Sequence, residues 1–463
     1  MQQANIPKVI IIGAGPGGLA LYHALIKNKD KKEFDVKIFE RESSPKERWQ
    51  GYHIALNSLG TQSLLNCVPS SITSNLQKAM PNPLPDVEFH GASIIDNKGS
   101  VLCNIPSKLF KDFNELVKVP DEFSLIITYR DRLRDVLLDG VPVHWGKKCI
   151  RYEETKDGVL VMFDDGSQEF CDILVGADGI NSPVRKQRLP ELQIFDYGIT
   201  NVVANIAVPK HFMDRFIKLQ GNCLLQKTLG THGDSSLVIF RLIPIEQEPD
   251  YKNKSNSNEL HYRVTLSYSY TSKLDDVESD KQKVDDNDSA SVIENVKQMI
   301  RNFVPECEFN EILLELWDLV PKSTPNDPEK YQYKTYNPTR RGQYHDIDPS
   351  SVKPWTSSRV TLLGDAVHAM NPVLGLGTNH AFQDADLLSK VLINYSSNDP
   401  ISCIQKYENE MRKRSTVDVL KSRSAALQMS SPVGHIGAII RNSSFKIINF
   451  ILNSKNIFKK LIQ

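Results

Sequence analysis

A glycine-rich turn near the start of the chain sets the tightest limit on its fold. The sequence KVIIIGAGPGGLALYHALIK leads a continuous apolar stretch into Gly13-x-Gly15-x-x-Gly18 and then into residues with helical spacing. An uninterrupted apolar strand is typical of a parallel sheet that is covered on both faces. The order of strand, tight glycine turn and helix therefore predicts a βαβ unit with a dinucleotide half-site.

Each glycine of this turn has a physical role. Gly13 allows the tight turn, Gly15 lets the backbone approach a pyrophosphate, and Gly18 lets helix and sheet pack closely. The helix N-terminus then offers N–H groups and a partial positive charge to the pyrophosphate. The expected second strand, residues 36–40, ends at Glu40, where a carboxylate would accept the hydroxyls of an adenosine ribose. FAD and NAD share this half-site, so the turn alone leaves the dinucleotide open.

A second glycine-rich stretch, GDAVHAMNPVLGLGTN, occupies residues 364–379. It places an acid, Asp365, in a tight turn and starts a helix only after two more glycines, Gly375 and Gly377. A turn alone needs one or two glycines, so this stretch indicates backbone that stays bare against a ligand. Between the two stretches, DILVGADGINSPVR ends a buried strand at Asp178 and Gly179.

These three motifs, in this order and with these separations, resemble the single-component (class A) FAD-dependent aromatic-ring monooxygenases, which have the p-hydroxybenzoate hydroxylase-like fold. The resemblance covers most of residues 7–395. It implies an α/β fold in which a Rossmann-like FAD-binding domain carries an inserted β-sheet substrate domain and a helical C-terminal region.

The resemblance and the local patterns divide the chain into three parts. A discontinuous FAD-binding domain takes residues 1–80, 121–188 and 355–400. A substrate-binding β-sheet domain takes residues 81–120 and 189–354, with a charged insertion near 273–291 that we expect to be mobile because it is nearly devoid of large apolar groups. Residues 401–463 form the helical C-terminal region.

The resemblance also implies cofactor contacts, residue by residue. Asp365 would accept a hydroxyl of the ribityl chain, Arg130 would bridge phosphates or ribityl hydroxyls, and Gly51 would let the chain pass near the ribityl region. Gly375 and Gly377 would lie against the isoalloxazine edge, and the helix beginning near Thr378 and Asn379 would aim N–H groups at flavin N1 and O2. Asp178 and Gly179 would lie near the pyrophosphate and the path of the nicotinamide donor. The complete predicted cofactor set is Gly13, Gly15, Gly18, Glu40, Arg41, Gly51, Arg130, Asp365, Gly375, Gly377, Thr378 and Asn379.

The implied chemistry uses FAD, with NADPH or NADH as a transient co-substrate, and dioxygen. A flavin C4a-hydroperoxide would hydroxylate or epoxidise an aromatic or polyketide-like small molecule. Because such a cofactor carries the hard chemistry itself, no catalytic side chain is assigned. We expect His368 to pack beneath the flavin loop, and His53 is a candidate substrate contact. An apolar or aromatic guest is favoured by residues that could equally be sheet core: Phe240, Leu242, Tyr262, Tyr268 and Tyr270.

Composition narrows the partners and the compartment. The 56 Lys and Arg residues balance 56 Asp and Glu residues, which gives no electrostatic case for nucleic acid. The seven cysteines contain no C-x-x-C pair, so neither a metal site nor a disulfide framework is indicated, and a reducing, cytoplasmic location is expected. The early strand leaves no room for a signal peptide, and no uncharged apolar run of about 18 residues could span a membrane. The C-terminal FKIINFILNSKNIFKKLIQ would either pack on the protein body or make weak contact with a membrane surface.

Three other functions stay open on the sequence alone. A plain NAD(P)-dependent dehydrogenase would explain residues 8–41 but would leave the motifs at Asp178 and Asp365 without a role. A flavin-dependent halogenase shares the fold, but the four tryptophans form no W-x-W-x-I-P segment. A flavin- or nucleotide-binding carrier on the same scaffold, similar to the GDP-dissociation inhibitors of lipidated small GTPases, would have no use for Asp365 or the flavin-edge glycines.

Overall fold

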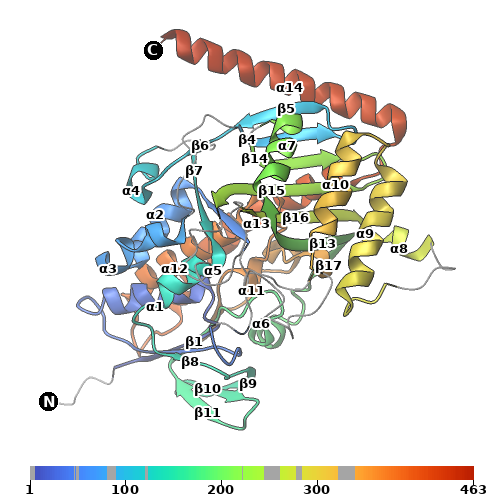
Figure 1. Ribbon diagram of the computed structural model, residues 1–463. Coiled ribbons are helices and arrows are strands. Elements are labelled where there is room, and N and C mark those ends of the chain that lie inside the picture. Colours follow the sequence, from blue (N-terminus) through green and yellow to red (C-terminus); the bar gives the residue numbers. More distant parts are fainter. Residues whose placement is uncertain are drawn as a thin grey trace, which may run out of the picture.

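A computed structural model gives the architecture of the chain (Figure 1). It describes residues 6–45, 47, 52–80, 90–119, 124–221, 223–244, 261–277, 284–321 and 339–462. Two large sheets, each with its own helices, account for most of these residues.

A five-stranded parallel sheet forms the centre of the first unit. Its order is β18-β12-β1-β2-β8, and every neighbouring pair runs parallel. After Lys8, β1 is buried along its whole length, as its apolar run predicted. The strand bounds are β1 (Lys8–Ile12), β2 (Asp35–Phe39), β8 (Val143–His144), β12 (Ile173–Gly176) and β18 (Val360–Leu362). The predicted βαβ unit is present, because the helix α1 (Pro16–Lys27) joins β1 to β2.

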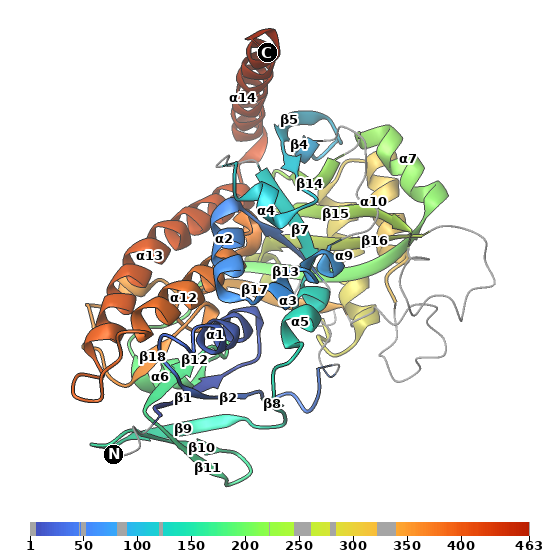
Figure 2. The ribbon, with the colours of Figure 1, turned by 90° about the vertical axis from the view of Figure 1, so that its left-hand side faces the viewer.

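Helices from distant parts of the chain pack around α1. The helix α12 (Gly377–Leu392) contacts α1, α2 (Ser58–Cys67) and α13 (Ser402–Ser430), and α5 (Arg130–Leu138) also contacts α1. Figure 2 shows α12 and α13 side by side at one flank of this unit. The shorter helices nearby are α3 (Ser70–Thr73), η1 (Leu76–Ala79), α4 (Phe113–Leu116), α6 (Pro183–Arg188) and η4 (Pro349–Ser351).

Two small sheets complete the first unit. The strands β9 (Cys149–Glu154), β10 (Val159–Phe163) and β11 (Gln168–Cys171) form an antiparallel sheet, and the β10–β11 hairpin turns at Gly166, whose φ is +82°. The sequence GVLVMFDDGSQEF predicts such a hairpin, because Asp165-Gly166 lies between two β-like stretches. The other sheet consists of β3 (His53–Leu56), β7 (Ser124–Tyr129) and β6 (Lys108–Leu109).

A seven-stranded sheet forms the second unit, in the order β17-β13-β16-β15-β14-β4-β5. Its long strands β13 (Phe195–Pro209), β15 (Ser235–Pro244) and β16 (His261–Thr271) pair antiparallel. The others are β4 (His90–Asp96), β5 (Val101–Pro106), β14 (Cys223–Leu229) and β17 (Arg340–Asp346). One face packs against α7 (Lys210–Gln220), α9 (Ser289–Phe303) and α10 (Glu308–Asp318), and alternate residues of β13 are buried there (Figure 1). The predicted α/β fold with an additional sheet and a helical C-terminal region is confirmed.

The structure decides between two readings of the tyrosines in this sheet. Tyr262, Tyr268 and Tyr270 are buried in the core between the sheet and its three helices, so they do not line a substrate site on the other face. The side chains of Phe240 and Leu242 lie outside the described residues.

The charged segment 273–291, for which the sequence predicts a mobile insertion, has described structure at both of its ends. Residues 273–277 form the helix α8 (Lys273–Val277), and Asp288 caps α9 by accepting hydrogen bonds from two backbone N–H groups. Arg341 on β17 pairs with Asp275 at 2.7 Å and with Asp286 at 2.9 Å. Ion pairs across the sheet edge therefore hold parts of a segment that has too few apolar groups to fold by itself; residues 278–283 lie outside the described residues.

The C-terminal region is helical, as predicted. After α13, the helix α14 (Gly434–Ile462) runs along β5 at the edge of the seven-stranded sheet (Figures 1 and 2). Within the described residues, no helix combines the length and the hydropathy that crossing a bilayer requires. All seven cysteines are free thiols.

Candidate functional site

The glycine turn after β1 opens onto a cavity. Gly13 has a φ of +110°, and a Cβ there would lie 2.3 Å from the carbonyl oxygen of Ala177. A Cβ on Gly18 would lie 2.1 Å from the carbonyl oxygen of Gly13, which would force turn and helix apart. Gly15 differs, because a Cβ there would meet nothing within 4 Å. Gly13 and Gly18 therefore shape the turn, while the space beside Gly15 is free for a ligand.

The helix α1 starts at this turn with free N–H groups. Gly15 precedes the helix, Pro16 takes its first position, and no described side chain caps it. Gly17 and Gly18 line the cavity. Uncapped N–H groups and the positive end of the helix dipole favour an anion, so this wall of the cavity suits a pyrophosphate.

Glu40 follows β2 beside the same turn, and its carboxylate is fixed by the backbone. Its Oε2 accepts a hydrogen bond from the N–H of Ala14 at 2.9 Å, and its Oε1 accepts one from the N–H of Glu42 at 3.2 Å. The residue is buried, yet it lines the cavity. A fixed carboxylate at this place can accept the hydroxyls of a ribose; contact of Glu40 with a ribose stays a prediction.

Arg134 is a cavity residue that the sequence analysis did not identify. Its Nε donates to the carbonyl oxygen of Ala14 at 3.0 Å, and its Nη1 donates to the carboxylate of Glu42 at 3.0 Å. Its Nη2 lies 3.7 Å from Oε2 of Glu40. A signal was available in the sequence, because Arg134 follows Arg130 by four residues and so shares its face of α5.

The turn after β18 faces the same cavity. Gly364 has a φ of +62°, and its N–H donates to the carboxylate of Asp384 at 2.9 Å. Asp365 begins α11 (Asp365–His368); it is surrounded by protein, yet its side chain stays accessible because it lines the cavity. Burial raises the pKa of Asp365, whereas His368 and Arg130 act to lower it. Asp365 is therefore an acceptor placed deep inside the molecule and open to a ligand.

The start of α12 lies next to this carboxylate. A Cβ on Gly377 would lie 3.6 Å from Oδ1 of Asp365. α12 begins at Gly377, one residue before the start that the sequence predicted, and Gly377 and Thr378 both line the cavity. The preceding turn, η5 (Pro372–Leu374), ends at Gly375 in the left-handed conformation with a φ of +65°.

The two glycine-rich stretches thus converge on one cavity of about 640 Å³. Bare backbone, an uncapped helix and a fixed carboxylate near one stretch, together with an accessible carboxylate and an arginine near the other, fit an elongated dinucleotide. The cavity wall includes nine of the predicted residues, namely Gly13, Gly15, Gly18, Glu40, Arg41, Arg130, Asp365, Gly377 and Thr378.

Three predicted residues stand apart from these nine. Gly51 lies outside the described residues. Neither Gly375 nor Asn379 is among the described residues that line the cavity. The Nδ2 of Asn379 donates to the carbonyl oxygens of Ala55 at 2.9 Å and Gly375 at 3.0 Å, and its Oδ1 accepts from the N–H of Asn57 at 3.0 Å. The Asn379 side chain therefore ties the start of α12 to the end of β3, and only its backbone could serve a ligand.

Asp178 and Gly179 lie after β12 and also line the cavity. Burial raises the pKa of Asp178 to about 6, although Ser182 and Arg185 act to lower it. Gly179 has a φ of +80°. Asp178 is therefore a carboxyl group in the cavity wall whose pKa is raised above its ordinary value by burial.

The two histidines considered in the sequence occupy different surroundings. His368 is fully buried, and its Nε2 lies 2.6 Å from Oδ2 of Asp384, behind the Asp365 turn. This agrees with the expected packing role beneath the turn. His53 lies on β3 with its ring 4.8 Å from that of Tyr129, and it is not among the described residues of the cavity wall.

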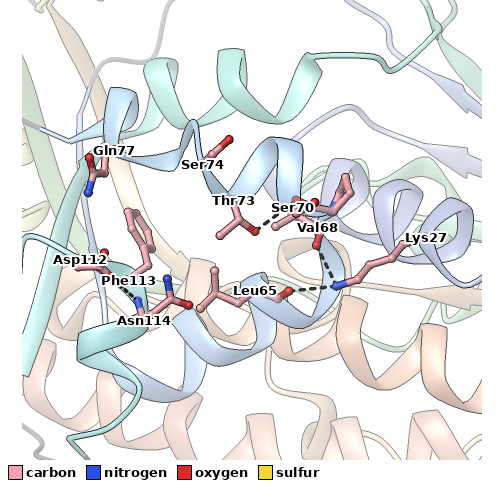
Figure 3. Close-up of a pocket in the computed structure, with 11 residues that line it drawn as sticks. Lys27, Leu65, Val68, Ser70, Thr73, Ser74, Gln77, Asp112, Phe113 and Asn114 are labelled. Carbon is pink, nitrogen blue, oxygen red and sulfur yellow. Dashed lines mark hydrogen bonds between the residues drawn. The ribbon is translucent and has the colours of Figure 1, made fainter.

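A second cavity, of about 710 Å³, lies between α2, α3 and α4 (Figure 3). Lys27 reaches its edge and donates to the carbonyl oxygens of Leu65, Asn66 and Val68 at 3.3, 3.0 and 2.9 Å. These bonds satisfy the C-terminal end of α2, where a cation is stabilising. The ammonium group thus has a structural role, and none of the predicted site residues lines this cavity.

The FAD binding domain family matches residues 332–420, which include the Asp365 turn and the start of α12. The FAD-dependent monooxygenase thnD of Trichoderma harzianum is 27% identical over 428 residues, covering 91% of this chain and 91% of that protein.

Solved structures share the fold. HpxO of Klebsiella pneumoniae, complexed with FAD and uric acid, has a TM-score of 0.65 and 20% identity, covering 96% of this chain and 93% of that one. The 2,6-dihydroxypyridine-3-hydroxylase of Arthrobacter nicotinovorans has a TM-score of 0.65 and 16% identity, covering 92% and 93%. These findings confirm the resemblance that the three sequence motifs predicted.

Proposed function

We propose that this chain acts as an FAD-dependent monooxygenase of the class A type, and we propose how it holds its cofactor and selects its substrate. FAD occupies the 640 Å³ cavity, NADH or NADPH acts as the electron donor, and an oxygen atom from O2 hydroxylates or epoxidises an aromatic or polyketide-like small molecule. The observation that carries the proposal is the convergence of the turns at Gly13–Gly18 and Gly364–Thr378 on one cavity.

The residues of the cavity wall support one orientation of FAD. The adenosine ribose would lie at Glu40, close to Arg134, and the pyrophosphate would lie against the N-terminus of α1 beside Gly15. The ribityl hydroxyls reach Asp365 and Arg130 at the other end. The N-terminus of α12 would then stabilise negative charge on the flavin ring, by about 0.3–2 kcal/mol from the helix dipole alone. Bound FAD supplies the activation of dioxygen after its reduction by the nicotinamide.

The face of the seven-stranded sheet opposite its three helices is polar, which favours an oxygen-bearing substrate. This face carries Asn201 and Asn205 on β13 and Thr265 and Ser267 on β16, opposite the face that α7, α9 and α10 cover. Oδ1 of Asn205 accepts from Thr265 at 2.6 Å, and Oδ1 of Asn201 accepts from the hydroxyl of Tyr344 at 3.2 Å. Hydroxyl and amide groups of this kind suit a hydroxylated or carbonyl-bearing ring. The ligand of the Klebsiella protein, uric acid, is such a ring.

Location belongs to the same proposal. A reducing, cytoplasmic compartment is supported by seven free cysteines, six of which are buried. The proposal also includes weak contact of α14 with a membrane surface, which is one of the two placements that the sequence left open.

The cofactor assignment is tested by Asp365→Ala. We expect the purified wild-type protein to be yellow and the variant to bind FAD about 10- to 100-fold more weakly, because a hydrogen bond to a charged group contributes about 1.5–3 kcal/mol. The ratio of flavin absorbance to protein absorbance measures occupancy, and circular dichroism verifies the fold. Unchanged flavin retention in the variant would refute the role of Asp365, and a colourless wild-type protein that takes up no added FAD would refute the whole proposal.

The reaction is tested by NAD(P)H oxidation with a panel of phenols, quinolones and polyketides. Oxygen transfer to a substrate, detected by mass spectrometry with ¹⁸O2, must accompany the oxidation. Hydrogen peroxide release without a labelled product indicates that water reaches the flavin and that the compound is not a true substrate.

A further inference from the structure

The helix α14 is fixed to the protein body by one of its faces. Phe445 and Leu452 pack against a small buried cluster on β4, β5 and β14. The guanidinium of Arg441 donates to the carbonyl oxygens of Gly230 at 2.8 Å and Leu229 at 3.2 Å, and Oδ1 of Asn449 accepts from the N–H of Asn104 at 3.0 Å. α14 thus lies along the sheet edge, with contacts to the sheet from Arg441 to Leu452 (Figures 1 and 2).

The outward face of α14 is apolar. Six large apolar residues recur at helical spacing along it and are all exposed, with Ile436 at 77% and Phe450 at 74%; the set is Ile436, Ile439, Ile440, Ile447, Phe450 and Ile451. We call these six residues the outer stripe. Two serine hydroxyls near the stripe bond within the helix, Ser444 to the carbonyl oxygen of Ile440 and Ser454 to that of Phe450. Their hydrogen bonds are therefore kept when the stripe leaves water.

The charge of α14 has one sign. Residues 434–462 contain no Asp or Glu, and their basic side chains are Arg441, Lys446, Lys455, Lys459 and Lys460. Lys446 is exposed and directly precedes Ile447 of the outer stripe. An apolar stripe bordered by lysine, in a helix without acids, matches a lipid surface that offers anionic headgroups above acyl chains. A second copy of this chain fits poorly as the occupant, because two α14 helices would bring only like charges together.

We infer that α14 is an interfacial helix that holds the enzyme on anionic lipid, with the outer stripe at the boundary between headgroups and acyl chains. This inference extends the membrane contact of the proposed function and adds its lipid class and its contact residues. Because the opposite face of α14 is packed on the sheet, docking places the β4–β5 edge of the substrate unit next to the lipid (Figure 1). An apolar substrate dissolved in the membrane would then lie close to the substrate unit.

The inference is tested by co-sedimentation of the purified holoenzyme with vesicles. We expect binding to vesicles of phosphatidylcholine with phosphatidylserine to exceed binding to phosphatidylcholine alone by at least about tenfold, and to weaken as salt is added. The double variant Ile447→Asp, Phe450→Asp should lose about tenfold or more of this binding, because it places charge in the stripe. The matched control is Leu59→Asp on α2, where Leu59 is 65% exposed, and it should bind as the wild type does.

Four outcomes overturn the inference: no binding to either vesicle, equal binding to both vesicles, full binding by the double variant, or equal loss in the Leu59→Asp control. Concentration-dependent dimers of the wild type that the double variant abolishes would assign the stripe to a second copy and also overturn it. Flavin content is measured in the same samples. A protein that contains flavin but does not co-sediment with vesicles refutes only this inference. A protein that lacks flavin but co-sediments with vesicles refutes only the cofactor proposal.

Discussion

At the scale of single residues, Gly15 and Gly18 of one motif have different roles. Gly18 is needed for the packing of the turn, and Gly15 leaves space for a ligand. Gly15→Ala should leave the free energy of unfolding of the cofactor-free protein within about 1 kcal/mol of the wild type, since its Cβ would meet nothing within 4 Å. The methyl group would fill space needed by the pyrophosphate, so FAD affinity should fall about 10- to 100-fold, as expected for overpacking. Gly18→Ala would place a Cβ 2.1 Å from a carbonyl oxygen and should cost about 2–3 kcal/mol of stability without any ligand. Urea denaturation and flavin titration of both variants distinguish the effects, and equal destabilisation by both would contradict the assignment.

The buried carboxyl group of Asp178 in the cavity wall predicts that the free energy of unfolding depends on pH. The pKa of Asp178 is raised by burial from 3.8 to about 6, so the native state binds this proton more tightly than the unfolded state does. Stability from this group is present below the unfolded pKa and is lost as pH rises to about 6. Asp178→Asn, which cannot ionise, should therefore gain roughly 2 kcal/mol over the wild type between pH 4 and pH 7 in the cofactor-free protein. Urea denaturation at several pH values measures this gain, and a constant difference between the two proteins would count against a raised pKa.

At the scale of elements, Asp384 joins α12 to α13 and to the turn at Gly364–Asp365. Its carboxylate on α12 accepts from the N–H of Gly364, pairs with His368 and pairs with Arg414 of α13. Burial alone would raise the pKa of Asp384, but His368 and Arg414 lower it to about 2. Asp384→Ala would remove the carboxylate that pairs with both Arg414 and His368, although Arg414 would keep its contact with His380, and should cost about 3–5 kcal/mol of stability. The matched control on the same helix is Lys390→Ala, whose exposed pair with Asp386 should cost at most about 0.5 kcal/mol. Similar thermal denaturation curves for the two variants would show that the network does not stabilise the turn.

Local sequence patterns predicted which helices, strands and turns form. They predicted less well which of these elements lie side by side in the fold. The βαβ unit, the hairpin at Gly166 and the start of α12 follow from glycine positions and apolar spacing, which act over a few residues. The side of the sheet on which Tyr262, Tyr268 and Tyr270 lie could not be predicted, because an alternating strand has two faces and the pattern does not say which one the helices cover. The ordering of residues 273–277 depends on Arg341, which is distant in the sequence. Arg134 could have been predicted as a site residue, since it follows Arg130 by about one helical turn.

At the scale of the whole molecule, the cavity joins segments that the chain order keeps far apart. Its wall takes the Gly13 turn and Glu40 from the start of the chain, Arg130 and Asp178 from the middle, and Asp365 from a late segment. A ligand that touches all of them stabilises the native state by RT ln(1 + [L]/Kd), about 2.7 kcal/mol at 100 times its Kd. Removal of FAD should therefore lower the Tm, and added FAD should restore it.

The length of the ligand determines how many of these segments it contacts, and therefore how much it stabilises the native state. In the proposed placement, ADP would contact the α1 end and Glu40 but not Asp365, whereas FAD would span both stretches of bare backbone. At equal concentration, FAD should raise the Tm of the cofactor-free protein more than ADP does, and the excess should shrink in Asp365→Ala, while the ADP shift stays unchanged. If ADP and FAD gave equal shifts in both proteins, the Gly364–Thr378 wall would take no part in binding, and only the half-site around Gly13–Gly18 would remain.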